Sequence, residues 1–243
     1  WQVKGEHIAL QLPNLKFSNA DAQGEAQIKW ETSDPAQSEG RSRFPGVLDL
    51  QAVLSRADGT RVYRYLPTVL SQSVRDYVRD AFPVGKASGV KFRVRGDLYD
   101  MPFKDPKKGE FRISADIHNA TFLYVPSRIQ SPGELPWPAL TQLNGELVIE
   151  RKQLQVRSAR AKFGSTSGLQ VTRVDANIPD MDQSIVSVTA DVRGPLPEVL
   201  GIVNGSPLAA MTEHALAQTV ATGLADYKFK LNLPLDNMDA STV

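Results

Sequence analysis

Apolar and polar residues alternate along most of this chain. Residues 91–95, 111–117 and 228–233 each place apolar side chains at every second position, with charged or polar ones between them. Successive side chains of a strand point to opposite faces of a sheet, so a period of two predicts antiparallel strands with one apolar and one solvated face. A protein built mainly from such strands has a long apolar face, and its function depends on what covers that face.

The same alternation recurs from one end of the chain to the other. Strands are predicted at residues 7–12, 15–17, 25–30 and 47–54, at seven or more places between residues 90 and 192, and at 227–233. Asp58 and Gly59 form a dipeptide favoured in tight hairpins, which predicts a hairpin continuing into residues 60–63. The polar loop at 31–46, with its Ser, Pro and Gly residues, is a possible internal boundary.

Two regions depart from the period of two. Between Pro67 and Pro83, apolar residues recur at steps of three and four, which predicts a helix. Residues 196–203 and 208–219 have the same spacing, each after a proline. The predicted fold is therefore mainly β: an extended, curved antiparallel sheet, groove-like or folded over on itself, with two short helical insertions. We expect residues 1–243 to form a single unit.

The apolar side of these strands is the candidate functional surface. If helices or a second sheet covered it, its side chains would be ordinary core. The predicted helices are too short to cover a dozen strands, so the sheet must fold over on itself or leave part of this face open as an interface or a ligand groove. The candidate lining residues are Phe92, Val94, Phe111, Ile113, Ile117, Phe122, Tyr124, Leu147, Ile149, Leu154, Val156, Val171, Val186, Val188, Phe229, Leu231 and Leu233.

Composition limits the possible partners. Lys and Arg total 28 against 27 for Asp and Glu, so the net charge of +1 gives no general attraction to nucleic acid. The chain has no cysteine, which excludes disulfides and thiolate zinc sites. No stretch approaches the roughly 18 apolar residues of a membrane span, so membrane contact is expected only through regions outside this sequence. Because the first residue is Trp1, we expect a fragment of a longer protein.

Residues that commonly carry chemistry lack the spacing that chemistry needs. His7, His118 and His214 are not spaced to share a metal ion, so no metal site is expected. Residues 164–168 superficially resemble a nucleophile elbow, but the central residue is Thr166 and the segment is interpreted as a hairpin connection. No catalytic residue and no cofactor are predicted.

Acidic and basic clusters have ordinary interpretations too. Asp180 and Asp182 offer two carboxylates to calcium, but without further oxygen ligands a solvated turn is preferred. Asp97 and Glu110 would serve a carbohydrate-active enzyme only if both were buried in one cleft. The basic loop at 104–108 is able to touch lipid phosphates or a partner protein, although such a loop is solvated by default.

Several short motifs occur in a characteristic order. They lie at residues 63–67, 74–77, 92–98, 102–103, 109–113, 136–140, 206–208, 222–225 and 231–235. Their order resembles the AsmA-like superfamily of Gram-negative bacteria, in particular the central periplasmic region of its YhdP family, which is related to TamB. The resemblance covers roughly residues 60 to 236, and the first sixty residues match less clearly.

The resemblance implies a periplasmic segment of an inner-membrane-anchored envelope protein. Members of the superfamily are thought to build a long β-sheet groove whose apolar lining conducts phospholipid toward the outer membrane. The implied partners are phospholipid acyl chains and neighbouring segments of the same full-length protein. Two alternatives stay open: a non-catalytic structural or protein-binding module in outer-membrane biogenesis, which would use sheet edges or the loops at 31–46 and 104–108, and the carbohydrate-active enzyme above.

Overall fold

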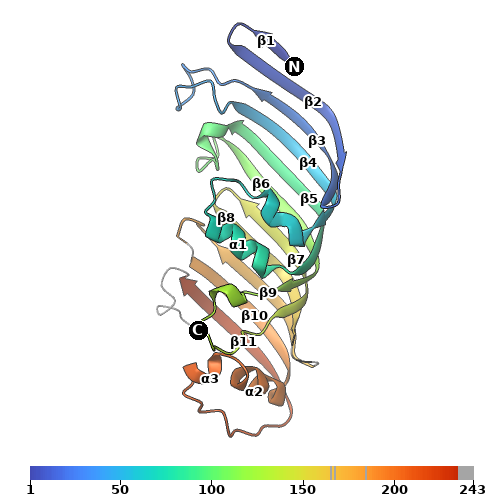
Figure 1. The fold of residues 1–243 in the computed structure, drawn as a ribbon, viewed down its shortest axis with the longest axis vertical. Coiled ribbons are helices and arrows are strands. Elements are labelled where there is room, and N and C mark those ends of the chain that lie inside the picture. The colour runs from blue at the N-terminus through green and yellow to red at the C-terminus, as the bar shows by residue number, and fades with distance from the viewer. Residues whose placement is uncertain (165, 167, 184, 235–243) are drawn as a thin grey trace.

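The chain forms one open antiparallel sheet (Figure 1). The structure is a computed structural model that describes residues 1–164, 166, 168–183 and 185–234. Each strand pairs antiparallel with the one before it, so the sheet is an up-and-down meander with β1 and β11 at its edges. The strands are β1 Gln2–Lys4, β2 His7–Ser18, β3 Ala22–Glu31, β4 Val47–Asp58, β5 Val84–Asp97, β6 Gly109–Phe122, β7 Leu140–Glu150, β8 Gln153–Phe163, β9 Gln170–Ile178, β10 Ile185–Pro195 and β11 Leu224–Pro234.

The mainly β, curved antiparallel fold predicted from the alternation is confirmed, but two strand predictions were wrong. The separate strands predicted at residues 7–12 and 15–17 form one strand, β2, whose pairing with β3 shifts register between Leu12 and Leu15. Among the described residues between 90 and 192 there are six strands and not seven or more, because residues 111–117 and most of 120–124 belong to one strand, β6. The pairing of β6 with β7 shifts register between Ile117 and Ala120, and Asn119 there has a φ of +47°. A bulge of this kind breaks the period of two without ending the strand.

The helical segments are short. They are the 3-10 helices η1 Gly59–Tyr65, η2 Leu98–Asp100 and η3 Ser127–Ile129, and the α-helices α1 Gln72–Ala81, α2 Leu196–Asn204 and α3 Leu208–Met211. The predicted hairpin at Asp58 is wrong, because the Asp58 side chain accepts a hydrogen bond from the Thr60 amide and caps η1 instead. A local side-chain cap here overrides the turn preference of the dipeptide.

Two helix boundaries also differ from the prediction. α1 begins at Gln72 and not near Pro67, because the hydroxyl of Ser71 accepts a hydrogen bond from the Val74 amide and forms the N-cap. α3 ends at Met211, and residues 212–218 form turns where a helix to residue 219 was predicted. α2 and the end of α1 lie where the spacing predicts them.

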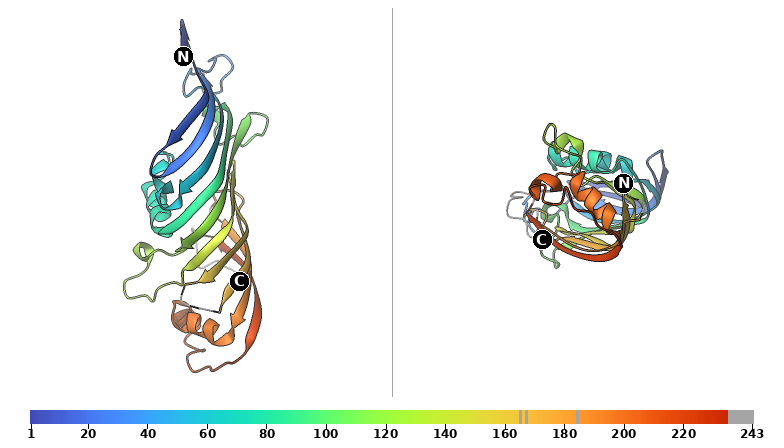
Figure 2. Two further views of the ribbon diagram at one scale, coloured as in Figure 1. Left: turned by 90° about the vertical axis from the view of Figure 1, so that its right-hand side faces the viewer. Right: turned by 90° about the horizontal axis from the view of Figure 1, so that it is seen from below.

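The α-helices of the described residues all lie in connections at the same end of the strands. Alternate connections of a meander lie at the same end of the strands, so the connections β4–β5, β6–β7 and β10–β11 lie together. We call this end of the strands the helical edge, as distinct from the edge strands β1 and β11. Its connections carry η1, α1, η3, α2 and α3. The opposite edge, the loop edge, carries residues 32–46 and the β5–β6 loop at 98–108. Figures 1 and 2 show η1 and α1 over one face of the curved sheet near its middle, and α2 and α3 at its C-terminal end.

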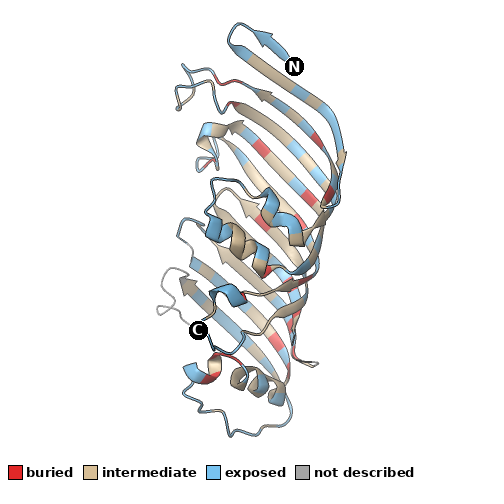
Figure 3. Ribbon diagram, in the orientation of Figure 1, coloured by how far each residue is buried: buried red, intermediate tan, exposed pale blue. Residues whose placement is uncertain are grey.

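The core is small for a chain of this length, and buried residues are scattered along the sheet (Figure 3). The one cluster of buried apolar side chains comprises Ala161, Leu169, Val171 and Val192 among the described residues, with Val199 and Ile202 of α2 packed against it. α2 therefore covers the C-terminal end of the sheet, and most of the remaining sheet has no second layer of comparable size.

A second closely packed point lies at the loop edge. Phe103 is fully buried, and its ring rests on the paired strands β5 and β6 where Gly96 and Gly109 oppose each other. A Cβ built on Gly109 would lie 2.5 Å from the Phe103 ring, and one on Gly96 would lie 2.7 Å from it. Two glycines are required here because the aromatic ring occupies the space that side chains would fill.

Candidate functional site

One face of the sheet is apolar across ten strands. Residues that are paired in register lie on the same face of the sheet, so the pairing assigns each strand residue to one face. We call this the inner face, and its five cross-strand rows are Leu12-Ile28-Leu50-Val94-Phe111, Ala26-Ala52-Phe92-Ile113-Ile149-Leu154-Ile178, Ala115-Leu147-Val156-Ala176-Val188-Leu231, Ala159-Val174-Ala190-Phe229 and Ala161-Val171-Val192-Tyr227. Every member is an aliphatic or aromatic residue, so the apolar surface is unbroken from β2 to β11.

The opposite, outer face is polar at nearly every position. Two of its rows are Gln11-Lys29-Asp49-Arg95-Glu110 and Gln27-Gln51-Arg93-Arg112-Glu150-Gln153. Arg93 pairs with Glu110 at 3.2 Å, and Arg112 pairs with Glu150 at 2.6 Å. Each of these two neighbouring arginines therefore has a carboxylate partner. The outer face exposes charged groups to solvent, and its positive and negative charges compensate each other.

The candidate lining residues predicted from the sequence all lie along this surface. Sixteen of the seventeen belong to the inner side of strands β5 to β11, and Tyr124 follows the end of β6. The prediction missed the contribution of β2, β3 and β4, which supply Leu12, Ile28 and Leu50. The alternation at residues 7–12, 25–30 and 47–54 carried that signal.

The inner face is only partly shielded. Among the seventeen candidate lining residues, Val94 and Val171 are buried, Phe229 is 39% exposed and the other fourteen are half-buried. A second sheet packed on this face would remove such side chains from water almost completely. The described residues provide no such sheet, since all eleven strands belong to one layer. The face is therefore accessible to an apolar ligand along part of its length.

Residues 59–82, here called the crossbar, span the inner face near its middle (Figures 1 and 2). Its C-terminal end is fixed to the sheet: Phe82 stacks on Phe122 at 5.0 Å between ring centroids, and the Tyr77 hydroxyl donates to the Tyr124 carbonyl at 3.1 Å. Trp137 extends the cluster by an edge contact to Tyr124 at 5.9 Å. Burial raises the pKa of the Tyr124 hydroxyl, which therefore stays protonated. The aromatic cluster therefore fixes the end of the crossbar to β6 and to the connection that follows β6.

The C-terminal end of the inner face is closed by α2. The carboxylate of Glu198, in the first turn of α2, accepts hydrogen bonds from the backbone amides of Gly168 at 2.9 Å and Leu169 at 2.8 Å. These bonds join α2 to the β8–β9 connection, where Leu169 is part of the buried cluster. The inner face is thus bounded at this end by α2, which the Glu198 carboxylate holds to the β8–β9 connection.

Replacing that acceptor tests how firmly α2 is held. We expect Glu198→Gln to lower the free energy of unfolding by about 1–2 kcal/mol, because charge-assisted hydrogen bonds to two amides become weaker. Hydrogen exchange of the α2 amides, followed by mass spectrometry, should show faster exchange there. Glu25→Gln, an exposed change on β3, is the matched control and should leave both quantities unchanged. Equal exchange rates of α2 in the two variants would contradict this role of Glu198.

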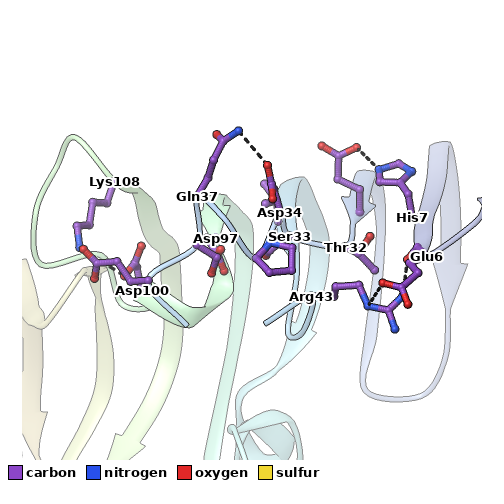
Figure 4. Close-up of a pocket in the computed structure, with 15 residues that line it drawn as sticks. Glu6, His7, Thr32, Ser33, Asp34, Gln37, Arg43, Asp97, Asp100 and Lys108 are labelled. Atoms are coloured by element: carbon purple, nitrogen blue, oxygen red, sulfur yellow. Dashed lines mark hydrogen bonds and ion pairs between the residues drawn. The ribbon is translucent and has the colours of Figure 1, made fainter. Parts of the chain in front are cut away.

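The loop edge carries a polar hollow of about 710 Å³ between β1–β2 and the loops at 32–46 and 98–108 (Figure 4). Its charges are largely compensated: His7 lies 3.4 Å from Glu31, and Lys108 contacts Glu39 and lies 3.5 Å from Asp100. Contact with Lys108 lowers the pKa of Glu39. Such a network holds the two loops to each other, and the described residues contain no cluster of His, Asp or Glu able to hold a metal ion.

The acid pair required by a carbohydrate-active enzyme does not form a shared cleft. Asp97 is half-buried beside the hollow; burial acts to raise its pKa, but hydrogen bonds, the first from the Tyr99 amide at 3.0 Å, outweigh burial and keep the pKa lowered. Glu110 is exposed on the outer face and paired with Arg93. Asp97 therefore acts as the cap of η2.

Other candidates from the sequence have structural partners. The ring of His118 shares a hydrogen bond of 2.7 Å with the Ser88 hydroxyl, and His214 lies in the turns after α3. Asp180 and Asp182 both contact Lys152 of the β7–β8 turn. Residues 164–168 connect the paired strands β8 and β9, with Ser165 and Ser167 outside the described residues.

An open, one-layer antiparallel sheet with an unbroken apolar face and a charged outer face defines a groove-forming β-sheet protein. The family model described as YhdP protein matches residues 1–243, and the chain belongs to this family. It is 26% identical over 190 residues to the intermembrane phospholipid transporter YhdP of Escherichia coli (strain K12). That alignment covers 78% of this chain and 14% of the relative, so the chain corresponds to a small part of it.

Two further findings complete the comparison. No solved structure matches the chain. Among the described residues, none of the helices is both long enough and apolar enough to cross a bilayer.

Proposed function

We propose that this chain is a segment of a periplasmic, inner-membrane-anchored bridge whose inner face shields acyl chains while phospholipid moves between the inner and outer membranes. The observation that carries the proposal is the set of unbroken, partly exposed apolar rows across β2 to β11. Each CH₂ group removed from water contributes about 0.8 kcal/mol, so an extended apolar surface stabilises a hydrocarbon chain without a specific pocket. Head groups lie at the side of the inner face that is open to solvent.

The chemistry of the two faces supports a role for the inner face in binding acyl chains. The inner rows contain no charged residue, while the outer rows are charged and ion-paired, so a lipid tail has one favourable surface on this sheet. The name of the Escherichia coli relative, an intermembrane phospholipid transporter, is consistent with this ligand class. In this proposal the chain has no catalytic role of its own, and lipid is carried and not altered.

We further propose that residues 1–243 act as one module joined to neighbouring segments of a longer protein. β3 and β4, on either side of residues 32–46, are paired along ten residue positions, so the sheet is continuous across that loop. The edge strands β1 and β11 expose unpaired backbone groups suited to strand addition by adjoining segments. The sheet would then continue beyond this chain in both directions, past β1 and past β11, with α2 covering the inner face near the C-terminal end.

Native mass spectrometry of the purified chain, with lipid extraction, tests the proposed function. We expect phospholipid to copurify and the melting temperature to fall after delipidation, because a bound ligand stabilises the folded state. If gently purified protein carries no phospholipid and delipidation changes neither mass nor melting, the acyl-chain proposal fails. That result would favour the alternative, a structural or protein-binding module acting through its edges and loops.

A further inference from the structure

The crossbar carries an arginine cluster in η1, next to the β2–β3 turn. Arg64 donates from Nε to the Tyr63 hydroxyl at 3.4 Å, and its guanidinium carbon lies 5.9 Å from the centre of the Tyr63 ring. Hydrogen bonding by Arg64, and by Arg61 in addition, lowers the pKa of the Tyr63 hydroxyl although burial opposes it. Positive charge therefore converges on one hydroxyl group in η1.

The charges of this cluster are not fully compensated. Arg64 pairs with Asp21 of the β2–β3 turn at 3.3 Å, whereas Arg61 is exposed and has no carboxylate within ion-pair distance in the described part of the chain. Arginine presents a planar fork of donors that matches the oxygens of a phosphate group. An anion bound here would gain one guanidinium that has no carboxylate partner among the described residues, a second guanidinium and a hydroxyl donor.

Exposed apolar side chains lie in the same segment of the chain as these donors. Val62 is 42% exposed and Val74 is 44% exposed, and Val69 between them in the chain is 88% exposed. A surface that combines exposed valines with arginines complements a molecule with an anionic group next to hydrocarbon, and a free anion would gain nothing from the valines. The crossbar lies over the inner face (Figures 1 and 2), so hydrocarbon attached to such an anion has the apolar rows beneath it.

We infer that the crossbar contains a phosphate subsite, in which Arg61, Arg64 and the Tyr63 hydroxyl bind the head-group phosphate of a phospholipid whose acyl chains lie on the inner face. This inference rests on the proposed function. It assigns the crossbar a role in lipid selection: diacyl lipids with a phosphate are retained at the middle of the sheet, and those without one are not.

Calorimetric titration of the purified chain with two lipids of equal tail length tests the subsite. The probes are dihexanoyl phosphatidylglycerol, kept below its micelle concentration, and dihexanoylglycerol, which lacks the phosphate. We expect the double variant Arg61→Gln/Arg64→Gln to bind the phospholipid about tenfold more weakly and dihexanoylglycerol unchanged. Tyr63→Phe, which keeps both arginines, should show a smaller loss. Arg95→Gln/Arg173→Gln removes the same charge from exposed outer positions and should have no effect.

Each other outcome overturns the subsite. If wild-type protein binds the two lipids equally, or if the double variant loses both lipids, the arginines do not recognise phosphate, while the proposed function survives. Binding of inorganic phosphate as tight as that of the phospholipid would show a general anion site and not a lipid subsite. Failure of wild-type protein to bind either lipid would refute the proposed function together with the subsite.

Discussion

Placing one carboxylate on the inner face, by Ile113→Asp, is expected to reduce the bound phospholipid about tenfold or more while the sheet stays folded. Ile113 lies between Phe92 and Ile149 in the longest apolar row. Burying an unpaired carboxylate against hydrocarbon costs several kcal/mol, more than the removal of a few methylene groups, so the lipid is expelled and the half-exposed charge is hydrated instead. Photocrosslinking of a diazirine-tailed phospholipid, quantified by mass spectrometry, measures the loss.

Two comparisons make this expectation specific to the inner face. Phe111→Asp and Leu147→Asp, on the rows to either side, should act in the same way. Gln51→Asp introduces the same charge on the outer face, opposite Arg93, and should leave crosslinking at the wild-type level. Circular dichroism should show an unchanged strand content in all four variants. Wild-type crosslinking in Ile113→Asp, with the fold intact, would show that tails do not lie on this face.

The sequence predicts on which face of the sheet a residue lies better than it predicts where the strands begin and end. The period of two depends only on the pleat, so residues such as Phe92 and Ile113 could be assigned to one side of a strand without knowing its partner. The register that joins them to Ile149 in one row is a property of pairing between distant segments. Bulges such as the one at Asn119 break the period locally, and this is why β6 resembles two strands in the sequence.

Features that depend on capping and tertiary contact were the ones the sequence did not predict. The hairpin expected at Asp58 does not form because the Asp58 carboxylate caps η1, and local side-chain hydrogen bonds of this kind compete with turn formation. The aromatic contact between Phe82 and Phe122 joins residues forty positions apart and leaves no periodic trace. The arginine cluster at Tyr63 was not predicted either, because its proposed role in binding a lipid phosphate depends on the crossbar lying over an apolar face.

Removing the Phe103 ring is expected to produce the largest loss of stability, about 3–5 kcal/mol for Phe103→Ala. The ring is fully buried on a backbone made of Gly96 and Gly109, which have no side chains able to move into the cavity. The loop at 98–108 should detach from the sheet, and the amides of the neighbouring ends of β5 and β6 should exchange faster. Urea unfolding gives the free energy, and hydrogen exchange locates the change.

The loss of stability in Phe103→Ala depends on how fully the ring is buried. A phenylalanine with a more exposed ring is therefore the proper control. Phe229 on β11 is 39% exposed, and Phe229→Ala should cost less than half as much, because less apolar surface returns to water and no closed cavity forms. Phe103→Leu, which keeps most of the volume, should fall between the two. If Phe103→Ala and Phe229→Ala unfold at the same urea concentration, the β5–β6 loop contributes no more to the fold than the exposed edge of the sheet does. The glycine pair beneath Phe103 would then need another explanation.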